Sequence, residues 1–250
     1  MAGGDPGLIA DAGMGIEPPA AVVASDVQMV IERIISNVAA TPGEFVTPPG
    51  YAHLSLSLVD AIYSIRSRYP AVKRVVAAYC VASGTGCQPL AARSIPGFSE
   101  HGLDFFLDQA GSQHGVALAD RLFAGNRSRT AGRLKADVCV EAARRLQAIS
   151  VTRIPDLRDR ADDAEVRHAW TGVHGLGWVT WQYFCSLAGI DRFKPDVMLT
   201  RFAAEALGRY VSPPETDALL SRAFEELRPS YPGLTKRALD HTIWLFERDR

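Results

Sequence analysis

Apolar residues recur at helical spacing through most of the chain. Val27, Val30 and Ile34 fall on one face of a first helix, for which Ser25 or Asp26 is the expected N-cap. Proline and glycine then interrupt the pattern at residues 47–50. The same periodicity predicts further helices at about 55–68, 71–82, 102–110, 115–123, 131–148, 163–171, 178–188, 197–209, 215–227 and 234–248.

Strand-like alternation of apolar and polar residues is hard to find anywhere in the chain. We therefore predict an all-α fold, with many short helices arranged in two lobes. Residues 1–25 are rich in Gly, Ala and Pro, which predicts a flexible tail before a single unit over 26–250. We expect lobe one to span about 70–205, with a hairpin at 163–188, and lobe two to combine 26–69 with 206–250.

The composition is that of a globular protein, with 47% hydrophobic and 22% charged residues in a chain of 250. No apolar run approaches the roughly 20 uncharged residues of a membrane-spanning helix, and the first residues do not resemble a signal peptide. We therefore expect a cytoplasmic protein without membrane contact. Its four cysteines, Cys80, Cys87, Cys139 and Cys185, form no CxxC pair, so we expect buried free thiols.

Charge is distributed unevenly, although the whole chain carries a net charge of only −1. Residues 1–60 hold one basic and seven acidic side chains, whereas residues 121–160 hold ten basic and four acidic ones. A basic sector of this kind favours contact with a phosphate backbone.

Two features between residues 173 and 208 suggest chemistry. Gly175-Leu176-Gly177 lies between two helical patterns, where paired glycines permit a tight turn and the next helix offers unpaired amides to a phosphate oxygen. An ordinary turn between helices has the same appearance. Asp196 follows Pro195 and opens another amphipathic helix, which makes it an N-cap candidate. A carboxylate there is either a simple cap or an anion held ionised by the helix dipole for catalysis.

The segment VHGLGWVTWQYFCSLAGIDRFKPDVMLTRFAAEALG, residues 173–208, resembles the helix-hairpin-helix (HhH-GPD) superfamily of DNA base-excision glycosylases. The resemblance extends over about residues 130–210 and is weaker over 55–70. It implies a two-lobed fold with the hairpin at the cleft and Asp196 as the catalytic carboxylate. Val179 stands where bifunctional members carry a Schiff-base lysine, 17 residues before Asp196, and Arg201 matches a position that is frequently basic. No cysteine follows Cys185, so the resemblance implies no iron-sulfur cluster.

The resemblance also assigns further residues. The segment GRLKADVCVEAARRL, residues 132–146, is similar to a lysine-alanine helix that precedes the hairpin, although a solvated amphipathic helix fits it equally well. The segment IYSIRSRY, residues 62–69, stands where many members of the superfamily have a glutamine-containing segment that wedges into the duplex beside the flipped base. The glutamine is missing here, and Arg66 either fills the gap left by the flipped base or is a surface arginine. The DNA contacts implied are Gly175, Leu176, Gly177, Val179, Thr180, Lys135, Arg66 and Arg201. A monovalent cation would bind the carbonyls of Thr171, Val173 and Leu176, without a side-chain metal site.

The activity implied is that of a monofunctional DNA glycosylase acting on a base flipped out of double-stranded DNA, by a monomer that joins the nucleoid when bound. Tyr63, Trp178 and Trp181 are pocket candidates, although aromatic residues at this spacing are also typical of a core. Trp181 departs from the small residue usual at its position. The sequence leaves open whether the base is damaged or a modified base of foreign DNA. A non-catalytic DNA-binding protein and an unrelated helical scaffold are the alternatives.

Overall fold

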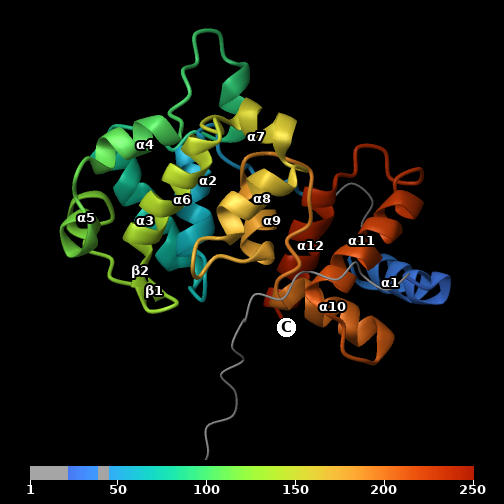
Figure 1. Ribbon diagram of the computed structural model, residues 1–250. Helices are drawn as coiled ribbons and strands as arrows, with labels where there is room; N and C mark the ends of the chain where they lie inside the picture. Colours follow the sequence, from blue (N-terminus) through green and yellow to red (C-terminus); the bar gives the residue numbers. More distant parts are fainter. Residues whose placement is uncertain (1–21, 39–44) are drawn as a thin grey trace, which may run out of the picture.

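The computed structural model describes residues 22–38 and 45–250 (Figure 1). Within these ranges the chain forms helices at nearly every position that the apolar periodicity predicted, and the fold is predominantly helical. The predicted tail lies largely outside the described residues, and the first helix already begins at Ala24. The elements are α1 (Ala24–Asn37), α2 (Leu54–Tyr63), α3 (Tyr69–Ser83), η1 (Leu90–Ser94), α4 (Leu103–Ala110), α5 (Gly115–Leu122), β1 (Arg129–Thr130), β2 (Arg133–Leu134), α6 (Lys135–Ala148), α7 (Ile154–Arg160), α8 (Ala164–Thr171), α9 (Trp178–Leu187), α10 (Val197–Leu207), α11 (Pro213–Leu227) and α12 (Lys236–Arg248).

Two apolar clusters form the interior. The larger is built from buried side chains between Leu54 and Ala188, and the smaller from the α1 residues together with those between Phe193 and Ile243. Figure 1 shows α1 beside α10 and α11 on one side of the molecule and the helices from α2 to α9 on the other. This division differs from the predicted lobes, because α2 belongs to the larger cluster and α10 to the smaller one.

Helix α2 is the central element of the larger cluster, and all ten of its residues are buried. Its sequence, LSLSLVDAIY, alternates apolar residues with small serines, which lets α6 and α9 pack closely on it. The helix ends at Tyr63, five residues before the predicted end, because the chain turns sharply at Arg66, whose φ is +49°. That turn leads directly into α3, which has Pro70 in its first turn.

Four elements were not predicted from the sequence. The 3-10 helix η1 and helix α7 are only five and seven residues long, too short to show a clear period. Strands β1 and β2 have two residues each and pair antiparallel, Arg129 with Leu134 and Thr130 with Arg133. A strand pair of this length carries no readable alternation, so its absence from the prediction has a simple physical cause.

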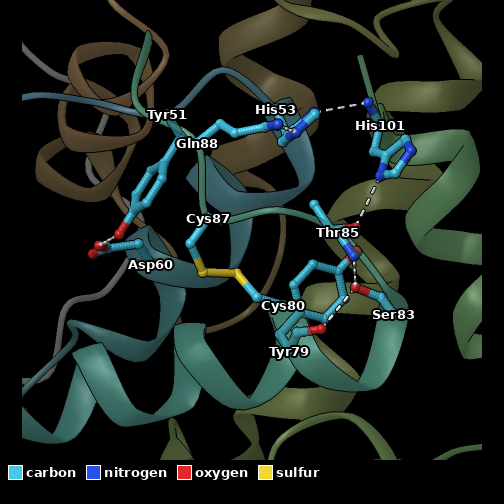
Figure 2. Close-up of a disulfide and its surroundings, with 10 residues drawn as sticks. All are labelled: Tyr51, His53, Asp60, Tyr79, Cys80, Ser83, Thr85, Cys87, Gln88 and His101. Carbon is cyan, nitrogen blue, oxygen red and sulfur yellow. Dashed lines mark hydrogen bonds between the residues drawn. A yellow bond between two sulfur atoms is a disulfide. The ribbon is translucent and has the colours of Figure 1, made fainter. Parts of the chain in front are cut away.

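The prediction of four free thiols is wrong for two of them, since Cys80 and Cys87 form a disulfide (Figure 2). Helix α3 ends at Gly84 with a φ of +69°, and this left-handed residue turns the chain back until the two Cα atoms lie 5.9 Å apart. Cys139 and Cys185 are buried and free, as expected.

The segment that follows the disulfide holds the N-terminal end of α2. Ala52 donates its amide to the Gln88 carbonyl at 3.1 Å, and His53 Nε2 lies 2.6 Å from Gln88 Oε1. His53 Nδ1 accepts the amide proton of His101 at 2.9 Å, so the ring proton resides on Nε2 (Figure 2). Burial lowers the pKa of His53, which keeps the ring neutral in this arrangement.

No helix among the residues described is both long and apolar enough to cross a bilayer.

Candidate functional site

The helical hairpin predicted at residues 163–188 is formed by α8 and α9 with a short loop over 172–177. Gly175 has a φ of +95°, and a Cβ placed on it would lie 3.1 Å from side-chain atoms of both Thr130 and Ala131. Thr130 Oγ1 also donates a hydrogen bond to the Gly175 carbonyl at 3.2 Å. The glycine is therefore required both by its backbone conformation and by close contact with the β1–β2 turn.

The side chain of Thr180 caps the start of α9. Its Oγ1 accepts the Gly177 amide at 3.0 Å and lies 2.7 Å from the Gly177 carbonyl, while Trp170 Nε1 donates to it at 3.0 Å. The Gly177 amide is thereby used inside the hairpin. The first-turn amides of Trp178, Val179 and Thr180 itself are the helix donors that have no intrahelical acceptor.

Val173 and Leu176 are also part of the hairpin loop, and their side chains are buried. The Leu176 amide donates to the Val173 carbonyl at 2.9 Å. The Val173 carbonyl is one of the three that the family resemblance implies as ligands of a monovalent cation. Among the residues described, no three His, Cys, Asp or Glu side chains gather in a group suited to hold a metal ion.

Asp196 is the N-cap of α10, as predicted. Its Oδ1 accepts the Met198 amide at 2.9 Å and the Leu199 amide at 3.4 Å. The other oxygen, Oδ2, lies 3.6 Å from Lys194 Nζ, and the Asp196 side chain remains 18% exposed. One carboxylate oxygen is therefore committed to the cap, whereas the second forms only a loose ion pair.

Lys194 connects Asp196 to a second carboxylate that sequence reasoning missed. The Lys194 ammonium lies 3.5 Å from the centroid of the Tyr183 ring, a cation–π contact. Tyr183 in turn donates its hydroxyl to Asp60 Oδ1 at 3.1 Å. Lys194 and Tyr183 thus link the carboxylate at the start of α10 to the buried interior of the larger cluster.

Asp60 is almost completely buried in α2 and accepts two further hydroxyls. Ser64 Oγ donates to its Oδ1 at 2.9 Å and Tyr51 Oη to its Oδ2 at 2.7 Å (Figure 2). Burial and the Asp60 charge raise the pKa of both Tyr51 and Tyr183, so these phenols stay protonated as donors. An aspartate within an otherwise apolar and serine-rich helix is the signal that could have revealed this group.

A third carboxylate, Asp240 of α12, contacts the backbone of Lys194. Its Oδ2 accepts the Lys194 amide at 2.5 Å. Burial raises the pKa of Asp240 to about 7, and the neighbouring Asp196 charge adds to this effect, whereas Lys194 and Arg237 oppose it. Asp240 therefore titrates near neutral pH beside the candidate carboxylate.

We expect Asp240→Asn to become more stable relative to the wild type as pH rises from about 4 to 7. The folded pKa exceeds the unfolded one, so in this window Asp240 keeps its proton in the folded protein and loses it in the unfolded chain, and the wild type loses stability as pH rises. Asparagine keeps an acceptor for the Lys194 amide and never ionises. Urea denaturation at pH 5 and pH 8 measures the difference, with the exposed Asp163→Asn as control. A difference in unfolding free energy that is the same at both pH values contradicts the prediction.

Three side chains predicted to contact DNA or a base are buried, and a fourth, Arg201, is exposed but paired. Lys135 is only 1% exposed, with its ammonium inside the protein, and Tyr63 and Trp181 are buried in the larger cluster. Trp181 packs there against Trp170 and Phe184. Arg201 donates to both the side chain and the backbone carbonyl of Glu247 at 2.5 Å, so it joins α10 to α12. The predicted DNA or base contacts of Lys135, Tyr63 and Trp181 are therefore corrected. Backbone carbonyls bind the Lys135 ammonium, and Tyr63 and Trp181 pack in the apolar core.

Apart from the buried Leu176, the remaining predicted side chains are at least partly accessible. Arg66 is exposed at the α2–α3 turn, and Trp178, Val179 and Thr180 are partly exposed at the start of α9. The structure therefore brings the hairpin and the β1–β2 turn into contact and connects the hairpin helix α9 with Asp196 through Tyr183 and Lys194.

A family described as a domain of unknown function, DUF8548, matches residues 30–248. The match covers most of the chain, which therefore belongs to this family. No curated protein and no solved structure matches the chain.

Proposed function

We propose that this member of the DUF8548 family is a monofunctional DNA glycosylase, which hydrolyses the N-glycosidic bond of a damaged or modified base flipped out of duplex DNA. The observation that carries the proposal is the arrangement of two helix starts. A glycine hairpin opens α9, and Asp196 caps α10 with one oxygen, while its other oxygen makes only a loose ion pair in a partly exposed side chain.

The chemistry needs an anion beside the sugar. Positive charge develops on the sugar as the base departs, and a fixed carboxylate stabilises that charge or activates the attacking water. The Met198 and Leu199 amides hold the Asp196 carboxylate in place at the positive end of the α10 dipole. In this proposal Oδ2 faces the sugar of the extruded nucleotide, so Lys194 must move aside or turn toward a phosphate.

The proposal includes fewer DNA contacts than the family resemblance implied. The first-turn amides of α9 bind a backbone phosphate, with Gly175 shaping the loop, and the carbonyls of Thr171, Val173 and Leu176 are the candidate cation ligands. Arg66 is the candidate for the gap left by the flipped base. Trp178 alone remains as a base-pocket candidate from the predicted aromatic residues.

We expect the reaction to leave an intact abasic strand that breaks only after hot alkali. Val179 has no amine with which to form a Schiff base. The nitrogen of Lys194, the lysine beside Asp196, is engaged between that carboxylate and the Tyr183 ring and is not free to act as the nucleophile. Duplexes carrying different lesions are incubated with the protein and analysed with and without alkali. The same reactions are treated with borohydride. A covalent adduct that disappears in Lys194→Met contradicts the monofunctional assignment.

One observation favours a second function, that of a non-catalytic DNA-binding protein. Both oxygens of Asp196 have partners within the chain, and the guanidinium of Arg201 is already paired with the Glu247 carboxylate. In that case Asp196 is a cap alone. Duplex binding without base release from any lesion favours this second function.

A further inference from the structure

Lys135 is the most unusual charged residue of the larger cluster. Its ammonium is buried at the start of α6 and donates to the Tyr63 carbonyl at 3.0 Å, the Ile65 carbonyl at 2.6 Å and Ser67 Oγ at 3.0 Å. These three acceptors use all three ammonium protons, and none of them is a carboxylate. Burial without a countercharge is costly and lowers the pKa of Lys135 to about 8, so the hydrogen bonds must offset that cost.

All three acceptors belong to the end of α2 and the turn that follows it. Arg66 stands at the centre of this turn with a φ of +49°, a conformation that a non-glycine residue adopts only when its surroundings enforce it. Two carbonyls before Arg66 and the Ser67 hydroxyl after it therefore point inward to Lys135. The Arg66 and Arg68 side chains remain exposed.

Lys135 also belongs to the segment that meets the helical hairpin. Its amide donates to the Ser128 carbonyl at 3.0 Å, immediately before β1, and Thr130 of β1 donates to Gly175. Figure 1 shows β1 and β2, with the loop that precedes α9, at the lower end of the helices that form the larger cluster. A continuous set of contacts thus runs from the Arg66 turn through Lys135 and the strand pair to the hairpin.

We propose that Lys135 is a positioning residue whose buried ammonium fixes the Arg66 turn to the β1–β2 pair and the hairpin, so that the three loops form one preformed face for the DNA backbone. The DNA part of this inference rests on the proposed function. The fixing of the turn does not, and it is tested separately.

The first test uses limited trypsin digestion of the full chain without DNA. In Lys135→Met the turn loses its three hydrogen bonds, and cleavage after Arg66 and Arg68 accelerates about tenfold or more, because the turn opens locally. Lys73→Met removes an exposed lysine of α3 and leaves the rate unchanged. Ser67→Ala, which deletes one of the three acceptors, gives a smaller acceleration and serves if Lys135→Met does not fold.

Cleavage after the exposed Arg144 of α6 reports global unfolding in the same digest. Equal acceleration at Arg144 and Arg66, or no acceleration at Arg66 in any variant, overturns the positioning role. Faster cleavage confined to the Arg66 turn supports it, whether or not the protein acts on DNA.

The second test is a double-mutant cycle on binding to a fluorescent duplex with a central abasic-site analogue. Lys135→Met and Arg66→Ala each weaken binding about tenfold, and the double variant binds no more weakly than either alone, because the lysine acts through the turn. Losses that multiply in the double variant overturn the proposal. Absence of wild-type binding overturns the DNA-docking part, together with the proposed function, and leaves the trypsin result to decide the role of Lys135.

Discussion

Asp196→Asn is expected to abolish base release while duplex binding persists. Asparagine is nearly isosteric and its oxygen still accepts the Met198 and Leu199 amides, so the variant loses only a few tenths to about 1 kcal/mol of stability. The negative charge disappears, however. Loss of electrostatic stabilisation fixed in place before the reaction typically costs about 100-fold or more in rate.

The measurement is single-turnover excision on a lesion that the wild type processes, with binding to the same duplex recorded in parallel. Removing an anion from the surface that faces the phosphate backbone leaves binding unchanged or slightly tighter. Asp163→Asn, which changes a carboxylate at the start of α8, is the matched control and keeps wild-type excision. If Asp196→Asn also excises at a near-wild-type rate, the carboxylate is a helix cap alone.

Duplex affinity should fall steeply with salt. If the hairpin and the exposed arginines make about three to five phosphate contacts, the slope of log K against log salt is about −2.7 to −4.5, a loss of roughly 40- to 500-fold between 50 and 200 mM salt. The net charge of the chain is only −1, so this attraction must come from a local surface that includes Arg66, Arg68 and Arg129.

Fluorescence anisotropy over this salt range measures the slope. Arg66→Ala reduces its magnitude by about 1 if that arginine contacts a phosphate. Arg222→Ala removes an exposed arginine of α11, beside the smaller cluster, and leaves the slope unchanged as the matched control. Salt-insensitive affinity, or no binding to any duplex, contradicts a backbone-docking surface.

Most of the helices could be predicted because their apolar residues recur at the 3.6-residue period, which is a property of each segment by itself. Asp196 could be placed at an N-cap for the same local reason, since its partners are two and three residues away. The Cys80–Cys87 disulfide depends on the left-handed Gly84 between the two cysteines, which their spacing alone does not reveal.

Side chains whose surroundings come from distant segments were not predictable. Lys135 looks like an exposed cation in its own helix, but its acceptors lie about 70 residues earlier, at the end of α2. Asp60 finds one of its donors, Tyr183, 123 residues later. Trp181 lies on an apolar face that meets Trp170 across the hairpin, so packing decides its role. These placements follow from tertiary contacts, which helical periodicity does not encode.

Identification of the released base by mass spectrometry tests the central claim most directly. Wild-type protein is incubated with duplexes that each carry one alkylated, oxidised or otherwise modified base, and the small-molecule fraction is analysed beside the DNA strand. The account predicts a free base from at least one duplex, an equal amount of abasic strand, and neither product with Asp196→Asn. Salt-sensitive duplex binding without a free base from any of these substrates would contradict the glycosylase assignment.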